Sequence, residues 1–101
     1  MVTMATKKDK TAPEPILVER VQTGVRLEKR LLKVLKGTAE YLDITVGDLL
    51  EGIVLHAFDG KVVPFSPATL SRIRQFKKIY GLNLDSSASH RLRESTDLLD
   101  S

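Results

Sequence analysis

The sequence predicts a mainly α-helical protein with one short β-strand, which pairs with the same strand of a second copy across an intertwined homodimer. Apolar and polar residues alternate over residues 20–27, as they do in a half-buried strand. Three later segments carry apolar residues at helical spacing, and the last of them adds a C-terminal helix. A chain of 101 residues buries only a small core by itself, which favours association with a second copy.

The strand is expected over residues 20–27, where alternate side chains point to opposite faces. One face is mostly apolar and β-branched, and consists of Val21, Thr23, Val25 and Leu27. The other face is cationic and polar, and consists of Arg20, Gln22, Gly24 and Arg26. A lone strand leaves its backbone groups unpaired, and the short run of residues 62–65 is a poor partner because Pro64 interrupts it. Antiparallel pairing with a second copy is therefore the simplest solution.

Two helices are expected after the strand. Residues 28–43 place one apolar stripe on a helix, although Gly37 weakens the helix locally; the stripe consists of Leu31, Leu32, Leu35, Ala39 and Leu42. A second helix begins at Thr45, which forms a capping box with Asp48, and it ends at the turn of residues 59–60. Its stripe is too wide for one neighbouring helix to cover, and consists of Val46, Leu49, Leu50, Ile53, Val54, Ala57 and Phe58.

A third helix is expected from Ser66, with Pro67 at its first position and Gly81 at its end. These elements predict four parts of the chain. Residues 1–15 form a disordered basic tail, residues 16–60 form the dimerisation domain, residues 61–82 form a helical extension, and residues 83–101 form a flexible tail. Within that tail, residues 90–99 carry the pattern of a short helix.

The composition excludes several classes of chemistry. The chain has no cysteine, which excludes disulfides, thiolate nucleophiles and cysteine-ligated zinc, and it fits the reducing cytoplasm. No segment approaches the roughly 20 apolar residues of a membrane span, and the start lacks the apolar region of a secretory signal. His56 and His90 have no partners at metal-ligand spacing, and no catalytic motif or phosphate-binding glycine loop is present. We expect a cytoplasmic protein that is not an enzyme and has no cofactor, metal or membrane partner.

The charges are segregated along the chain, although the net charge is only +3. Residues 21–36 carry five basic residues against one acidic residue, residues 37–60 carry five acidic residues and no lysine or arginine, and residues 61–82 carry five basic residues and no acidic residue. This order indicates one polarised face. The alternative is a set of ordinary solvated helix faces.

One strand followed by two helices, with a basic outer face on the strand, resembles the ribbon-helix-helix family of repressors. The residues that carry the resemblance are Val21-Gln22-Thr23-Gly24-Val25-Arg26-Leu27, the helix from Glu28, and Ile44-Thr45-Val46-Gly47-Asp48-Leu49-Leu50. The resemblance covers about residues 18–60, and it implies a bacterial homodimer that binds double-stranded DNA and regulates transcription. It implies base contacts in the major groove from Arg20, Gln22, Gly24 and Arg26. It implies phosphate contacts at the start of the second helix from Thr45, Val46 and Gly47.

Each of these assignments has an alternative. The polar strand residues are alternatively a solvated edge, and Thr45 is alternatively only a helix cap. The basic residues of the third helix either touch flanking phosphates or form the outer face of a packed helix; they are Arg72, Arg74, Lys77 and Lys78. Two other functions also fit the pattern. One is an antitoxin-like DNA-binding dimer whose C-terminal region binds a partner protein, and the other is a dimerisation module without DNA contacts.

Overall fold

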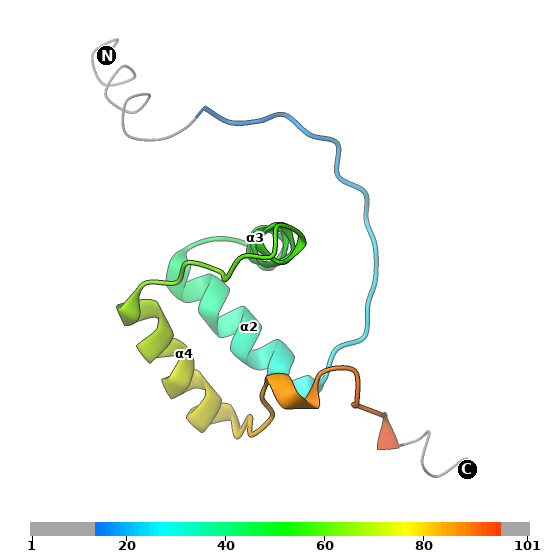
Figure 1. The fold of residues 1–101 in the computed structure, drawn as a ribbon, viewed down its shortest axis with the longest axis vertical. Helices are drawn as coiled ribbons and strands as arrows, with labels where there is room; N and C mark the ends of the chain where they lie inside the picture. Colours follow the sequence, from blue (N-terminus) through cyan, green and yellow to red (C-terminus); the bar gives the residue numbers. More distant parts are fainter. Residues whose placement is uncertain (1–13, 96–101) are drawn as a thin grey trace.

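The computed structural model describes residues 14–95, which form three α-helices and one short 3-10 helix. The elements are α2 (Lys29–Leu42), α3 (Val46–Phe58), α4 (Pro67–Tyr80) and η1 (Ser86–Ala88). Figure 1 shows α2 and α4 side by side, with α3 seen nearly end on and packed against α2. Residues 14–28, named the arm below, run extended past α3 to the start of α2. The three predicted α-helices are confirmed to within one or two residues at each end.

The first and last residues of α3 and α4 follow from local chemistry, as predicted. The Thr45 hydroxyl accepts a hydrogen bond from the backbone N–H of Asp48 at 3.0 Å. The Ser66 hydroxyl accepts one from the N–H of Thr69 at 3.1 Å, and Pro67 occupies the first turn of α4. These bonds satisfy donors that have no partner inside the helix. Gly81 ends α4 in the left-handed conformation, at a φ of 69°, which glycine adopts without steric cost.

The start of α2 has a cap that the sequence pattern did not indicate. The Glu28 carboxylate accepts a hydrogen bond from the N–H of Leu31 at 2.8 Å and one from Arg30 Nε at 2.9 Å. The N–H of Leu31 is the main reason that the pKa of Glu28 lies below its usual value. Arg30 also donates to the carbonyl of Gly81 and to the side-chain oxygen of Asn83, both at 3.1 Å. The first turn of α2 is thereby tied to the end of α4.

The α2 and α4 helices run antiparallel and meet along a seam of three residue pairs. In order along α2, these pairs are Lys33 with Tyr80, Gly37 with Phe76, and Tyr41 with Arg72. A Cβ atom added at Gly37 would lie 3.3 Å from the Phe76 ring, closer than ordinary contact. Gly37 therefore allows the two helices to approach each other, which explains a glycine inside a helix despite its poor helix propensity.

The core between these helices is small. The buried apolar side chains of residues 14–95 are Val34, Ala39, Leu49 and Leu82, and none of them is completely buried. Thr38 and Thr69 are buried beside them, and the Thr38 hydroxyl donates to the carbonyl of Val34. The predicted apolar stripe of α2 is therefore only partly correct. Leu31 is exposed, because α4 covers the neighbouring face of α2, where Val34 and Thr38 lie.

The predicted β-strand is wrong, and with it the predicted fold of a ribbon paired across an intertwined homodimer. No residue from 14 to 95 is in a strand, and the four residues of the expected polar face lie in the extended arm. The alternating pattern specifies an extended backbone, but a strand also needs a hydrogen-bonded neighbour. Neither the run around Pro64 nor any other described segment supplies one. The domain of residues 16–60 is thus an extended arm followed by two helices.

Residues 1–13 of the first predicted tail and residues 96–101 of the second lie outside the described residues. The part of the second tail that is described, residues 83–95, crosses the ends of α2 and α4 and contains η1. Of the short helix predicted over residues 90–99, residues 90–94 are not helical, and residues 96–99 lie outside the described part. Across residues 14–95, no helix has the length and apolar character needed to cross a membrane.

Candidate nucleic-acid interface

The packing of α2 against α4 joins two basic segments that are distant in the sequence. Together the helices carry seven lysine and arginine residues that form no ion pair within residues 14–95. We name them the basic surface; they are Lys29, Lys33, Lys36, Arg72, Arg74, Lys77 and Lys78. All except the half-buried Lys77 are exposed. Glu40 is the one acidic residue of the two helices, so this part of the molecule has a strongly positive surface.

Aromatic rings lie among these cations along the seam. The Nζ atom of Lys33 lies 5.7 Å from the centre of the Tyr80 ring, and the guanidinium carbon of Arg72 lies 5.0 Å from the centre of the Tyr41 ring. Phe76 stacks against Tyr80, with ring centres 6.4 Å apart. These contacts place the charged ends of Lys33 and Arg72 over aromatic rings, while both residues remain exposed.

The acidic segment lies on the other side of α2. The α3 helix carries Asp48 and Glu51 and has no lysine or arginine. The molecule is therefore polarised, with cations on α2 and α4 and carboxylates on α3. This arrangement agrees with the polarised face predicted from the order of charges along the chain, and the packing of the helices produces it.

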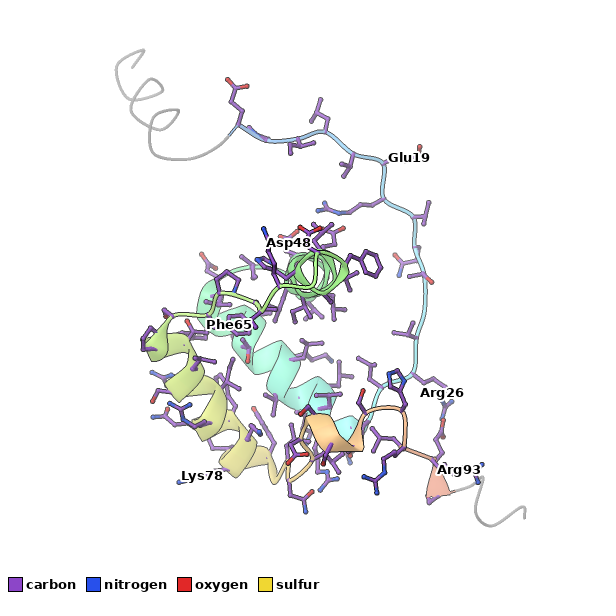
Figure 2. All side chains as sticks on the ribbon, in the orientation of Figure 1. Glu19, Arg26, Asp48, Phe65, Lys78 and Arg93 are labelled. Atoms are coloured by element: carbon purple, nitrogen blue, oxygen red, sulfur yellow. The ribbon has the colours of Figure 1, made fainter. Side chains whose placement is uncertain are left out.

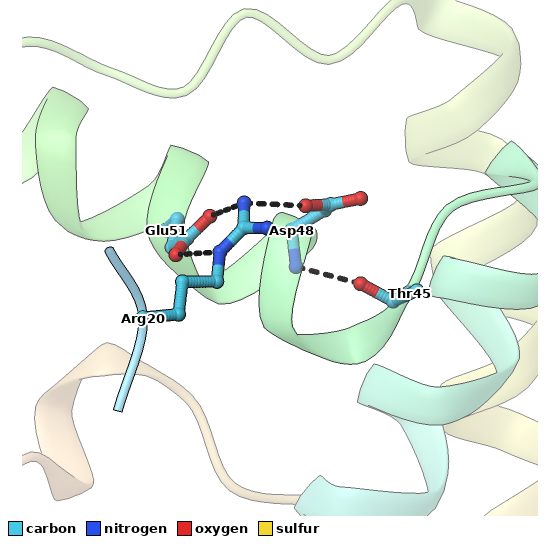
Figure 3. A network of polar contacts seen from close by, with 4 residues as sticks. All are labelled: Arg20, Thr45, Asp48 and Glu51. Carbon is cyan, nitrogen blue, oxygen red and sulfur yellow. Dashed lines mark hydrogen bonds and ion pairs between the residues drawn. The ribbon is translucent and has the colours of Figure 1, made fainter. Parts of the chain in front are cut away.

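Arg20, the first predicted base-contacting residue, reaches α3 and binds two carboxylates (Figure 3). Its Nε atom donates to Glu51 at 2.8 Å, and its Nη2 atom donates to Glu51 at 2.7 Å and to Asp48 at 3.2 Å. The hydrogen bonding of Arg20 to the Glu51 carboxylate is the largest cause of the raised pKa of Arg20, and it also lowers the pKa of Glu51. The side chain of Arg20 is still 63% exposed, so water reaches this ion pair.

Arg26, the last predicted base-contacting residue, forms a similar pair with the C-terminal segment. Its Nε atom donates to one oxygen of Glu94 at 2.7 Å, and its Nη2 atom donates to the other oxygen. These hydrogen bonds raise the pKa of Arg26. Arg26 is 84% exposed and lines a cleft of about 830 Å³ together with Lys29, Arg93 and Glu94. Figure 2 labels Arg26 and Arg93, which lie near each other beside this cleft.

The other two predicted base-contacting residues lie between these arginines. Gln22 and Gly24 are exposed, and a Cβ atom added at Gly24 would meet nothing within 4 Å. The four predicted residues are thus spread along the arm, and carboxylates hold the two that carry charge.

The predicted phosphate site at the start of α3 is only partly open. The Thr45 hydroxyl caps the helix, Val46 is half-buried, and Gly47 is exposed. The carboxylate of Asp48 lies in the same turn and binds Arg20, which places negative charge where a phosphate was expected. The basic surface is therefore better placed for phosphate than the start of α3. The sequence showed the two basic segments but not that they pack together, and so the interpretation did not single out Lys29, Lys33 and Lys36 as candidates.

The α3 helix leaves much of its apolar surface uncovered. Its only buried residue is Leu49, whereas Leu55 is 64% and Phe58 is 82% exposed. Val54 and the nearby Val62 are also exposed. Among the helices, α3 packs closely on α2 alone. An apolar helix with so little cover is typical of a surface that is buried in an assembly.

Comparisons of the chain with protein families, curated proteins and solved structures find no match. The resemblance to ribbon-helix-helix proteins therefore stays a prediction from the residue pattern, and its fold is the part that the structure contradicts.

Proposed function

We propose that the protein binds double-stranded DNA and regulates transcription, with the basic surface of α2 and α4 contacting the phosphates. The observation that carries the proposal is that two packed helices bring seven exposed or half-exposed cations into one part of the molecule, with one acidic residue among them. A helix of 14 residues is about 21 Å long, which spans roughly six base pairs of a duplex. Phosphate contacts supply most of the affinity of such an interface and make it depend on salt.

The proposed DNA-binding unit is a homodimer formed through the apolar face of α3. The chain buries few apolar side chains of its own within the described residues, so the apolar face of α3 needs a binding partner whenever the protein is folded. A second copy of the same chain is always present to bind this face, whereas a different protein with its own regulated expression is not. Two copies also give the unit a twofold axis, which matches an operator with two half-sites.

The test is duplex binding measured by fluorescence anisotropy over a series of salt concentrations. The parent protein is expected to bind with an affinity that falls steeply as salt rises. The double variants Lys29→Gln/Lys36→Gln and Arg74→Gln/Lys78→Gln should each bind more weakly. Each should also reduce the slope of log affinity against log salt by up to about 4, because about 0.9 is lost per phosphate contact and the homodimer loses four cations.

Lys61→Gln is the matched control, because Lys61 is exposed and lies in the loop between α3 and α4, outside both basic helices. An equal loss of slope per charge in this control would mean that the net charge, not the basic surface, binds DNA. Selection of bound sequences from a random duplex library then tests the regulatory role. A twofold-symmetric motif supports a transcription regulator, and the absence of any preferred sequence contradicts it.

A further inference from the structure

We propose that the arm is a second DNA-binding element whose two arginines bind DNA phosphates in the complex. In the free protein, the carboxylates of Asp48, Glu51 and Glu94 bind these arginines in place of the phosphates. The inference rests on the proposed function, because DNA is the ligand that competes with these carboxylates. It assigns a role to three acidic residues and makes Arg20 and Arg26 available only when the internal contacts are broken.

The geometry of both contacts matches that of a phosphate. Glu51 and Glu94 each offer two oxygens to the Nε and Nη2 atoms of one guanidinium group. Two oxygens of a phosphate bind the same pair of donors in the same planar arrangement. One guanidinium fork cannot make both contacts at once, so binding of these donors to DNA and binding to the carboxylates exclude each other.

The arm has few other attachments. Within the described residues, all hydrogen bonds from residues 14–27 to the rest of the chain are made by Arg20 and Arg26. The large apolar side chains of the arm are exposed along its length. Exposed ion pairs of this kind contribute little to stability, so a polyanion can displace them at small cost.

Release of Arg26 also changes the cleft that it lines. The cleft is lined by two carboxylates, Glu28 and Glu94, and by three cations. Glu94 pairs with Arg26, and the other two cations are Lys29 and Arg93. Because Lys29 belongs to the basic surface as well, an arm released from Glu94 extends that surface towards residues 20–26.

The experiment measures duplex affinity for Glu51→Gln and Glu94→Gln. Each variant should bind about two- to fivefold more tightly than the parent, as expected for the loss of one competing surface ion pair. Asp59→Asn is the matched control, because Asp59 is an exposed acidic residue at the end of α3, outside both basic helices, that forms no ion pair within residues 14–95. If the loss of any negative charge raised the affinity for DNA, this control would also bind more tightly by the same factor. That result overturns the proposal.

A double-mutant cycle isolates the role of the arginine. The gain from Glu51→Gln should disappear in an Arg20→Gln background, because no arginine is then released, and a gain that persists overturns the proposal. Mass spectrometry of early trypsin cleavage gives a readout without DNA. Cleavage after Arg20 and Arg26 should be faster in the Glu51→Gln/Glu94→Gln variant than in the parent, and unchanged rates count against the internal contacts.

The results separate this inference from the proposed function. If the parent binds duplex DNA through the basic surface but Glu51→Gln and Glu94→Gln bind as the parent does, only the inference fails. If the parent binds no duplex at any salt concentration, both fail.

Discussion

Gly37 and Gly52 both lie inside helices, but only Gly37 has a close neighbour. A Cβ atom at Gly52 would meet nothing within 4 Å, so Gly52→Ala should stabilise the fold by about 0.5–1 kcal/mol through helix propensity. Gly37→Ala should give no such gain, because its Cβ presses on Phe76, and Gly37→Val should cost about 1–3 kcal/mol by overpacking. Denaturant unfolding measures all three. Equal gains from both alanine variants would contradict the packing of α2 on α4.

The Glu28 cap makes a pH-dependent contribution to stability. Its pKa is lowered in the folded chain, chiefly because its carboxylate accepts the N–H of Leu31. A lowered folded pKa means that the stabilisation is present above the unfolded pKa, near 4.3, and is lost as the pH falls through the folded pKa. Glu28→Gln should therefore reduce the loss of stability on acidification, as measured by unfolding at a series of pH values below 5. A loss of stability on acidification that is the same in Glu28→Gln as in the parent would contradict the role of this cap.

At the scale of elements, the sequence predicted what local rules determine. Thr45, Ser66 and Gly81 act within one turn of the chain, so the ends of α3 and α4 were predictable. The pairing of α2 with α4 was not predictable. Gly37 and Phe76 are 39 positions apart, and no local pattern in either segment indicates that the two pack together. The error over residues 20–27 has the same origin, since an alternating pattern specifies an extended backbone but not its neighbour.

The packing of α4 separates the proposed function from the antitoxin-like alternative. An antitoxin-like segment folds when it meets its partner, whereas α4 packs along the whole of α2 and is capped at both ends. We expect the backbone amides in the middle of α4 to be protected from hydrogen exchange in the isolated protein, to about the same degree as those of α2. Nuclear magnetic resonance of the full chain measures both. Rapid exchange confined to α4 would favour the alternative.

At the scale of the whole molecule, the candidate site was only partly predictable. Composition and charge order indicated a polarised chain, and the arm arginines were selected as functional residues. Their ion pairs were not predictable, because Arg26 and Glu94 are 68 positions apart and the pairing depends on the path of the C-terminal segment. The resulting molecule has three different surfaces: the cations of α2 and α4, the apolar face of α3, and an arm held between carboxylates.

The apolar face of α3 should control the oligomeric state. Leu55 and Phe58 are 64% and 82% exposed, and twofold symmetry places two copies of each in the proposed interface. Burying one such side chain contributes about 1.5 kcal/mol or more, so Phe58→Ser should weaken the dimer by about 3 kcal/mol, roughly a hundredfold in Kd.

Ile79→Ser is the matched control, because Ile79 is 69% exposed but lies on α4. Sedimentation at micromolar concentration should give a dimer for the parent and the control, and a shift towards monomer for Phe58→Ser. The melting temperature of the parent should also rise with protein concentration. A monomeric parent, or a dimer lost in Ile79→Ser but kept in Phe58→Ser, would remove α3 as the interface.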